Sequence, residues 1–380
     1  MTSDPLRSLT LTVATVTPAT RWAFLEISTA SGLGGVGEAS ISSPRQEALG
    51  EAFAAIAPWA LALPDAAPSA LPENYPLPAL PIAAVFSALD QALWDVAAQR
   101  RGVSLAEALG GVRRDAVPVY ANINRRTRDR SPEGFAASAR DALAVGFEAF
   151  KIAPFDEADA AARQAGNLDR AMQPGLARIA AVRDAIGPHC ALMVDCHWRF
   201  DLPAAEAAIA RSAASGVRWI ECPLPETSDN IPALRHLRHL ANARGMLLAG
   251  CEQHIRAEGF SPFLRGGAYD VLMPDVKYVG GLAEMLRLAE AMRAAGVAFS
   301  PHNPTGPVSH AASAQVSAAV PALDMLEMQF DETPNFDRLQ TTPIAGPSGG
   351  TVVLPRAAGL GVTLNQVTLD RVRTMRWTAP

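Results

Sequence analysis

From about residue 140 onward, the pattern of hydrophobic and polar positions repeats. Each repeat is an Ala-rich amphipathic segment that ends at a glycine and is followed by a short, uniformly apolar run. Glycine adopts the left-handed conformation at low cost, so it is the usual residue just past a helix. Short apolar runs without alternation are typical of parallel strands that are buried on both faces. The joints read AVGFEAFKIAP, DAIGPHCALMVD, ASGVRWIECP, ARGMLLAGCE, RGGAYDVLMPD and AAGVAFSPHN.

Two further apolar runs, at 117–124 and 324–331, flank these six and bring the expected strands to eight. Eight strands that alternate with helices are typical of one α/β architecture, the (β/α)8 or TIM barrel. We therefore expect a barrel over residues 116–339.

The first 115 residues lack this pattern and predict an α+β capping domain. The segments LRSLTLTVATV and RWAFLEISTASGLGGVGEAS indicate a hairpin or meander, and helices are expected at 45–62 and after residue 81. The Pro-rich stretch between them, 62–81, fits a disordered linker or an ordered loop. We favour the loop, because its Leu, Tyr and Ala side chains can pack. The tail, 340–380, has two strand-like runs and is expected to complete the cap.

Composition narrows the class further. Of 380 residues, 49% are apolar and 19% charged, which favours a packed core over disorder. The net charge of -5 gives no general attraction to nucleic acid or anionic membranes, so neither is an expected partner. The N-terminus does not resemble a signal peptide, and no uncharged apolar run reaches the ~18 residues of a membrane span. Four cysteines make no disulfide framework, which favours the cytoplasm.

Polar residues stand at the ends of successive predicted strands, 23 to 31 positions apart by subtraction of their numbers: Asp195, Glu221, Glu252, Asp275, His302 and Glu327. Barrel enzymes keep their chemistry at the carboxyl ends of the strands. The first three are carboxylates that would converge and repel, so a hard cation between them is expected, and oxygen ligands favour Mg²⁺ over zinc. The adjacent Cys196, Cys222 and Cys251 invite a zinc interpretation. Strand alternation turns them toward the helices, which favours buried structural cysteines.

The remaining candidates surround this predicted metal site. His197 lies two residues after Asp195, so the same alternation turns it toward the site. Asp275 beside His302 would fix the imidazole tautomer and raise its basicity, which makes the pair a candidate general base. Lys151 would add positive charge beside the metal, and Glu327 would hydrogen-bond a substrate oxygen if protonated.

Several neighbouring residues receive weaker assignments. Asn303, Trp198 and Arg199 are candidates for contact with the substrate, although the last two could equally close the barrel mouth. His254 and His310 are interpreted as packed histidines. Lys277 is expected on the surface or in a loop.

Taken together, these residues resemble the enolase superfamily, and within it the mandelate racemase/muconate-lactonizing group, over nearly the whole chain. SALDQALWDVAAQRRGVSLAEALGG is similar to the group's cap-to-barrel helix, and LMVDCHWRF, WIECPLPE, LLAGCEQ and MPDVKYVGG are similar to successive strand ends. The resemblance implies that Asp195, Glu221 and Glu252 bind Mg²⁺. It also implies an Asp275–His302 dyad and a glutamate on strand eight, Glu327.

The sequence departs from the group in two places. Members often carry Lys-x-Lys after strand two, where this chain has Lys151-Ile152-Ala153, and the loss of one base argues against two-base racemisation. The aspartate-x-histidine at 195–197 instead resembles members that dehydrate sugar acids. The cap loop TPAT is short, where members often have a longer lid.

The resemblance implies Mg²⁺-dependent dehydration of an aldonate or aldarate to a 2-keto-3-deoxy acid. His302 would remove the α-proton, Mg²⁺ and Lys151 would stabilise the enediolate, and His197 would protonate the departing hydroxyl. A cycloisomerase or epimerase with the same enolate chemistry is the alternative, and a non-catalytic metal-binding barrel and a metal-dependent hydrolase are weaker ones. We expect a small-molecule carboxylate substrate. We also expect a homo-oligomer, in which a neighbouring subunit would help to cover the site.

Overall fold

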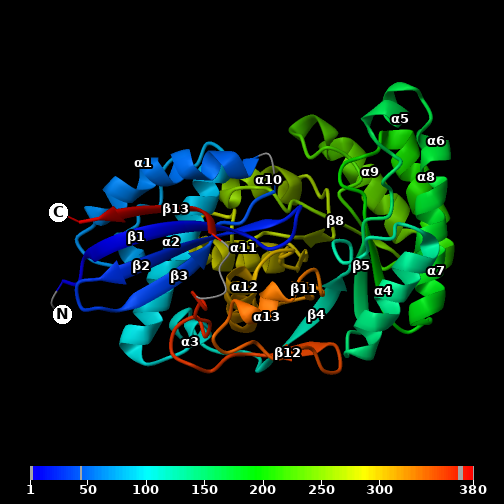
Figure 1. Ribbon diagram of the computed structural model, residues 1–380. Coiled ribbons are helices and arrows are strands. Elements are labelled where there is room, and N and C mark those ends of the chain that lie inside the picture. Colours follow the sequence, from blue (N-terminus) through cyan, green and yellow to red (C-terminus); the bar gives the residue numbers. More distant parts are fainter. Residues whose placement is uncertain (1–2, 43–44, 367–370, 380) are drawn as a thin grey trace.

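Eight parallel strands follow one another around a barrel in chain order, as the repeat predicted (Figure 1). The structure is a computed structural model that describes residues 3–42, 45–366 and 371–379. The strands are β4 (Ala116–Asn122), β5 (Ala149–Ile152), β6 (Ala191–Asp195), β7 (Trp219–Glu221), β8 (Leu247–Gly250), β9 (Val271–Leu272), β10 (Ala298–Phe299) and β11 (Leu326–Gln329).

Hydrogen bonds close this sheet into a cylinder. β11 pairs with β4 in parallel. Between β10 and β11, the Asp324 N–H donates to the Phe299 carbonyl (2.9 Å) and the Glu327 N–H donates to the Pro301 carbonyl (3.2 Å). Inside the barrel, Tyr120 and Trp219 are buried edge to face, with ring centroids 5.6 Å apart. The interior is therefore packed, and its chemistry is confined to one end.

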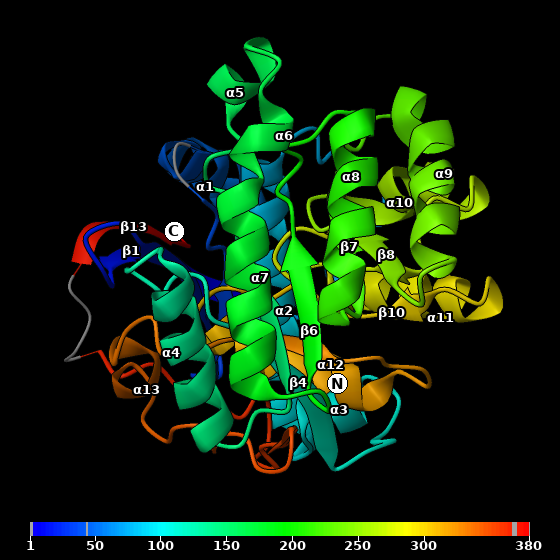
Figure 2. The same ribbon diagram turned by 90° about the vertical axis from the view of Figure 1, so that its right-hand side faces the viewer.

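Helices cover the outside of the barrel, and α4, α7 and α8 stand side by side in Figure 2. The covering helices are α4 (Pro132–Ala144), α5 (Ala160–Gln164), α6 (Leu168–Ala171), α7 (Gln173–Ile186), α8 (Leu202–Ser212), α9 (Ile231–Asn242), α10 (Arg256–Arg265), α11 (Leu282–Ala294) and α12 (Pro307–Ala319). A glycine with positive φ lies in each of the six joints that the repeat identified: Gly146, Gly187, Gly216, Gly245, Gly267 and Gly296. These glycines end the helices and return the chain to the next strand.

The cap is a four-stranded antiparallel sheet covered by helices, on the left in Figure 1. Its strands β1 (Leu6–Thr15), β2 (Arg21–Thr29), β3 (Gly34–Glu38) and β13 (Arg371–Thr378) pair in the order β13-β1-β2-β3. Its helices are α1 (Leu49–Leu61), α2 (Leu80–Arg101) and α3 (Leu105–Ala108). At Gly37 a Cβ would lie 2.0 Å from the Ala88 carbonyl oxygen, so β3 rests directly on the backbone of α2.

The Pro-rich stretch and the tail are both packed. Tyr75 stacks on Phe86 of α2 with centroids 5.1 Å apart, in agreement with an ordered loop. In the tail, β12 (Thr351–Val353) pairs with β4 of the barrel, and β13 pairs with β1 of the cap. By length and composition alone α2 could cross a membrane, but 72% of its apolar window is buried within the protein.

Candidate active site

Three carboxylates converge at the carboxyl ends of neighbouring strands. Asp195 ends β6, Glu221 ends β7, and Glu252 follows β8 by two residues. One oxygen from each lies within 4.8 Å of the others, and all three side chains are buried. The Glu252 Oε2 atom has no hydrogen-bond partner among the described residues. Burial, reinforced by the neighbouring carboxylates, raises the pKa of Glu252 well above its usual value. A buried carboxyl oxygen without a hydrogen-bond partner, beside two other carboxylates, fits a hard divalent cation, which would relieve the repulsion between the ionised groups.

Lys151 on β5 neutralises part of this charge. Its Nζ lies 2.6 Å from Glu221 Oε1 and 2.9 Å from Glu327 Oε1, and all three side chains are buried. Burial opposes the ionisation of Glu327, but Lys151, His302 and the Asn303 N–H together lower its pKa below the usual value. Glu327 is therefore an anion held by Lys151, whereas a protonated side chain was the condition for its predicted contact with substrate.

The predicted Asp275–His302 pair is present. His302 Nδ1 lies 2.7 Å from Asp275 Oδ2, and His302 Nε2 faces the cluster, 3.5 Å from Glu252 Oε2. Lys277, expected on the surface or in a loop, lies in the turn after β9 but is fully buried, and its Nζ contacts Asp275 Oδ1 and Oδ2 at 2.8 and 2.7 Å. The loop alternative is therefore confirmed and the surface alternative is wrong, because the buried carboxylate of Asp275 lies within reach of the lysine.

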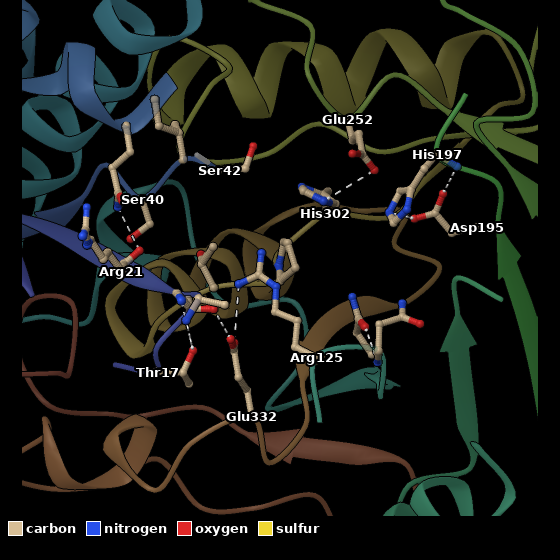
Figure 3. A pocket seen from close by; sticks show the side chains of 18 of the residues that line it. Thr17, Arg21, Ser40, Ser42, Arg125, Asp195, His197, Glu252, His302 and Glu332 are labelled. Atoms are coloured by element: carbon tan, nitrogen blue, oxygen red, sulfur yellow. Dashed lines mark hydrogen bonds and ion pairs between the residues drawn. The ribbon is translucent and has the colours of Figure 1, made fainter. Parts of the chain in front are cut away.

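His197 lies beside Asp195 in Figure 3, and His302 lies beside Glu252. Its N–H donates to Asp195 Oδ1 (2.8 Å), and its Nε2 is 2.8 Å from Asp195 Oδ2. The predicted proximity is correct, but strand alternation is not its cause. The strand ends at Asp195, and a positive φ of 47° at His197 folds the chain back onto the carboxylate.

A cavity of about 770 Å³ opens above these groups, within the range of small-molecule sites. The short cap loop predicted from TPAT forms one wall, from Thr17 to Arg21. Thr20 Oγ1 donates to Glu332, and Thr333 Oγ1 donates to the Val16 carbonyl (3.1 Å). The short loop therefore reaches the site because the segment after β11 holds it.

Most of the cavity wall was not anticipated from the sequence. Trp198 lines the cavity as predicted, together with barrel residues and cap residues that carried no signal in their local pattern. The unanticipated wall residues with polar side chains are Arg21, Ser40, Ser42, Gln46, Asn122, Asn124, Arg125, Arg128, Gln253, Tyr278, Thr305 and Glu332. The four that belong to the cap, Arg21, Ser40, Ser42 and Gln46, reach the cavity only because the cap docks onto the barrel.

Two predicted substrate-binding residues have other partners. The Asn303 amide donates to the Glu327 carbonyl (3.2 Å) and accepts from Ser309 Oγ (2.9 Å), so Asn303 anchors the residue that holds Lys151. Arg199 donates to the Asp156 carbonyl (3.2 Å) and is not among the described residues that line the cavity. Both side chains therefore form hydrogen bonds within the protein.

The other histidines pack against aromatic rings as predicted, although Cys251 and His254 also lie with Glu226 in a group whose ligand atoms are within 4.8 Å of one another and could hold a metal ion. His254 packs on Phe263 and His310 packs on Phe336, with centroids 4.7 and 5.8 Å apart. Burial lowers the pKa of both histidines to about 4. The three cysteines beside the triad are free and buried: Cys196, Cys222 and Cys251.

This fold and this arrangement of groups match known families in sequence. The family Enolase C-terminal domain-like matches residues 134–368, and the family Mandelate racemase / muconate lactonizing enzyme, N-terminal domain, matches residues 2–110. The chain therefore belongs to the enolase superfamily, in its mandelate racemase/muconate-lactonizing group. Members of this superfamily use Mg²⁺.

Curated relatives include enzymes of acid-sugar metabolism. The D-gluconate dehydratase of Thermoproteus tenax is 34% identical over 291 residues, which are 77% of this chain and 56% of that protein. The D-galactarolactone cycloisomerase of Agrobacterium fabrum is 30% identical over 76% of this chain and 73% of its own length. The D-galactonate dehydratase of Ralstonia pickettii is 29% identical over 73% and 70%. This chain thus spans little more than half the length of the first of these relatives.

A solved structure confirms the fold. The enolase-superfamily member from Salmonella Typhimurium superposes with a TM-score of 0.86 over 99% of this chain and 100% of its own, at 22% identity. At that identity the likeness concerns the arrangement of the chain alone.

Proposed function

We propose that the protein is a Mg²⁺-dependent hydro-lyase that converts an aldonate or aldarate into a 2-keto-3-deoxy acid. The observation that carries the proposal is a pair of imidazoles that contact different carboxylates of one cluster, His197 at Asp195 and His302 at Glu252. His302 is held by Asp275, and His197 is held by Asp195. Dehydration next to a carboxylate needs a base for the α-proton and an acid for the departing hydroxyl, and this site offers one group for each.

Each residue then has a defined task. Asp195, Glu221 and Glu252 would hold Mg²⁺, whose positive charge makes the α-proton of a carboxylate more acidic. Lys151 would bind a substrate carboxylate oxygen, and Glu327 keeps Lys151 in place. His302 Nε2 accepts the α-proton while Asp275 accepts the hydrogen bond from Nδ1. His197 donates a proton to the leaving β-hydroxyl, and the enol product tautomerises to the keto acid.

A cycloisomerase is the second candidate, because a relative of that name aligns with most of the chain. It would use the same base without loss of hydroxide. NMR of the product separates the two reactions, since dehydration gives a keto-deoxy acid that has lost one water, whereas isomerisation gives an isomer of unchanged mass. A two-base racemase is disfavoured, because Ala153 stands where the second lysine of Lys-x-Lys would be.

The test is turnover of an aldonate and aldarate panel with Mg²⁺, together with a separate measurement of Mg²⁺ binding. We expect His302→Ala to lose about 10²- to 10⁴-fold in turnover and to keep Mg²⁺ binding. Glu221→Gln should lose both, and His239→Ala, an exposed histidine on α9, should change neither. Near-normal dehydration by His302→Ala would show that the base is another residue.

We further propose that the enzyme works in the cytoplasm on a free small-molecule carboxylate. We propose a homo-oligomer as its assembly. Gel filtration with light scattering would measure that state directly, and a monomer at micromolar concentration would contradict it.

A further inference from the structure

Four arginines follow β4 in the segment NRRTRDR, and they divide into two pairs. Arg126 and Arg130 are held by carboxylates and do not line the cavity: Arg126 contacts Asp331 (3.0 Å) and Arg130 contacts Asp156 (2.7 Å). The other two, Arg125 and Arg128, line the cavity. Their different surroundings indicate different tasks.

Carboxylates of the protein compensate little of the positive charge of Arg125 and Arg128. Arg128 is exposed to the cavity and has no carboxylate partner among the described residues. Arg125 has one, Glu332, at a long 3.4 Å, and one donor of its guanidinium is used there. Glu332 also accepts from Thr20, so its charge is shared with the cap loop.

A third arginine enters from the cap. Arg21 begins β2 and lines the same cavity, and no carboxylate of the described chain pairs with it. In Figure 3, Arg21 and Thr17 lie on the side of the cavity away from Asp195 and Glu252, and Arg125 projects between the two sides. Beyond the metal-binding carboxylates, the cavity lining therefore includes three guanidinium groups, those of Arg21, Arg125 and Arg128, and one further carboxylate, Glu332.

From this separation of charge we infer that the substrate is a dianion, with a second anionic group at the end of its carbon chain. One carboxylate of the substrate would lie at the metal-binding cluster, and the distal anion would meet Arg128, Arg125 and Arg21. This inference rests on the proposed function and deepens it from acid sugars in general to diacids. A terminal carboxylate, as in an aldarate, and a terminal phosphate share this chemistry, because a guanidinium fork binds either one with two hydrogen bonds.

A monoacid would not use this wall. The terminal hydroxymethyl of an aldonate is neutral, and a hydrogen bond from a cation to a hydroxyl is weaker than one to an anion. Hydrogen bonds to charged groups contribute about 10- to 150-fold each in binding. We therefore expect aldarates to exceed the matching aldonates in kcat/KM by at least about 10-fold.

The experiment compares D-glucarate and galactarate with D-gluconate and D-galactonate, and adds 6-phospho-D-gluconate as the phosphate probe. Arg128→Gln removes a guanidinium that has no carboxylate partner among the described residues, and Arg128→Lys keeps the charge but not the fork. Arg140→Gln, an exposed arginine on α4 outside the cavity, is the matched control. We expect Arg128→Gln to lower the ratio of kcat/KM for diacid over monoacid by about 10-fold or more, mainly through KM. Arg128→Lys should recover part of the loss, and Arg140→Gln should leave the ratio unchanged.

The outcomes are distinguishable. A preference for aldarates or for the phosphorylated aldonate, lost in Arg128→Gln, supports a distal anion and identifies its chemistry. Turnover of aldonates as efficient as that of diacids, with a ratio that Arg128→Gln does not move, overturns this inference and leaves the proposed function standing. Absence of turnover with every compound, in a folded protein that binds Mg²⁺, contradicts the proposed function itself.

Discussion

The buried ion pair between Lys277 and Asp275 gives the sharpest test of how the site is built. Both side chains have no measurable exposure, and Lys277 Nζ contacts both carboxylate oxygens at 2.7 to 2.8 Å. Lys277→Met keeps the length of the side chain and removes the charge. It leaves Asp275 with the Lys277 N–H (2.8 Å) and His302 Nδ1 (2.7 Å).

The expected loss follows from the uncompensated charge. Removal of one partner of a buried pair destabilises by about 3–5 kcal/mol, because the other charge stays buried. Since Asp275 keeps two donors, we expect the lower end, about 3 kcal/mol. Burial opposes the ionisation of Asp275, while Lys277 and His302 lower its pKa below the usual value. Loss of Lys277 should therefore also loosen the hold of Asp275 on His302 and reduce kcat more than it changes KM.

Urea unfolding of four proteins measures this effect: wild type, Lys277→Met, Asp275→Asn and the double variant. We expect the sum of the losses in unfolding free energy of the two single variants to exceed the loss in the double variant by roughly 2 kcal/mol, within the range found for residues in direct contact. Additivity within about 0.5 kcal/mol would mean that the two side chains do not interact, and the argument from burial would fail.

Two further predictions concern the cap and its contact with the barrel. Burial raises the pKa of Asp90 to about 7, although the Leu282 N–H donates to it. The unfolded chain therefore ionises first as the pH rises from about 4 to about 7, and the protein loses stability over that window, by on the order of 4 kcal/mol at most. Asp90→Asn should lack this loss. If the free energy of unfolding in urea changed between pH 4 and pH 8 by the same amount in Asp90→Asn as in the wild type, the prediction would be wrong. Gly37→Ala places a Cβ 2.0 Å from the Ala88 carbonyl oxygen. It should therefore destabilise the protein by about 1–3 kcal/mol or more. Gly32→Ala is the control: its Cβ meets no atom within 4 Å, so it should show only the strain of its positive φ. Equal melting temperatures for these two variants would show that the cap can shift away from α2.

The strand ends show how far local pattern reaches. Helix-terminating glycines and apolar runs identified all eight barrel strands, and parallel strands bring their carboxyl ends together by geometry. The convergence of Asp195, Glu221 and Glu252 at one end of the barrel follows from that rule. His197 was placed correctly for a different reason, because its position depends on a positive φ beyond the strand.

The pairing of charges was beyond the reach of the pattern. A single sequence does not reveal whether a lysine in a loop after a strand meets solvent or a buried carboxylate, so the burial of Lys277 was not predicted. Asn303 and Arg199 were predicted to contact the substrate, and the structure gives them contacts with Glu327 and Asp156.

The sequence by itself determined the barrel, its order of strands and the ring of acidic and histidine side chains at one end, because these depend on periodicity along the chain. Only the tertiary structure decided the rest of the cavity lining, which includes Arg21, the loop from Thr17, Arg125, Arg128 and Glu332. Those residues come from separate segments whose docking depends on complementary surfaces and not on any local repeat. The tertiary structure was therefore needed to show how charge is distributed around the cavity.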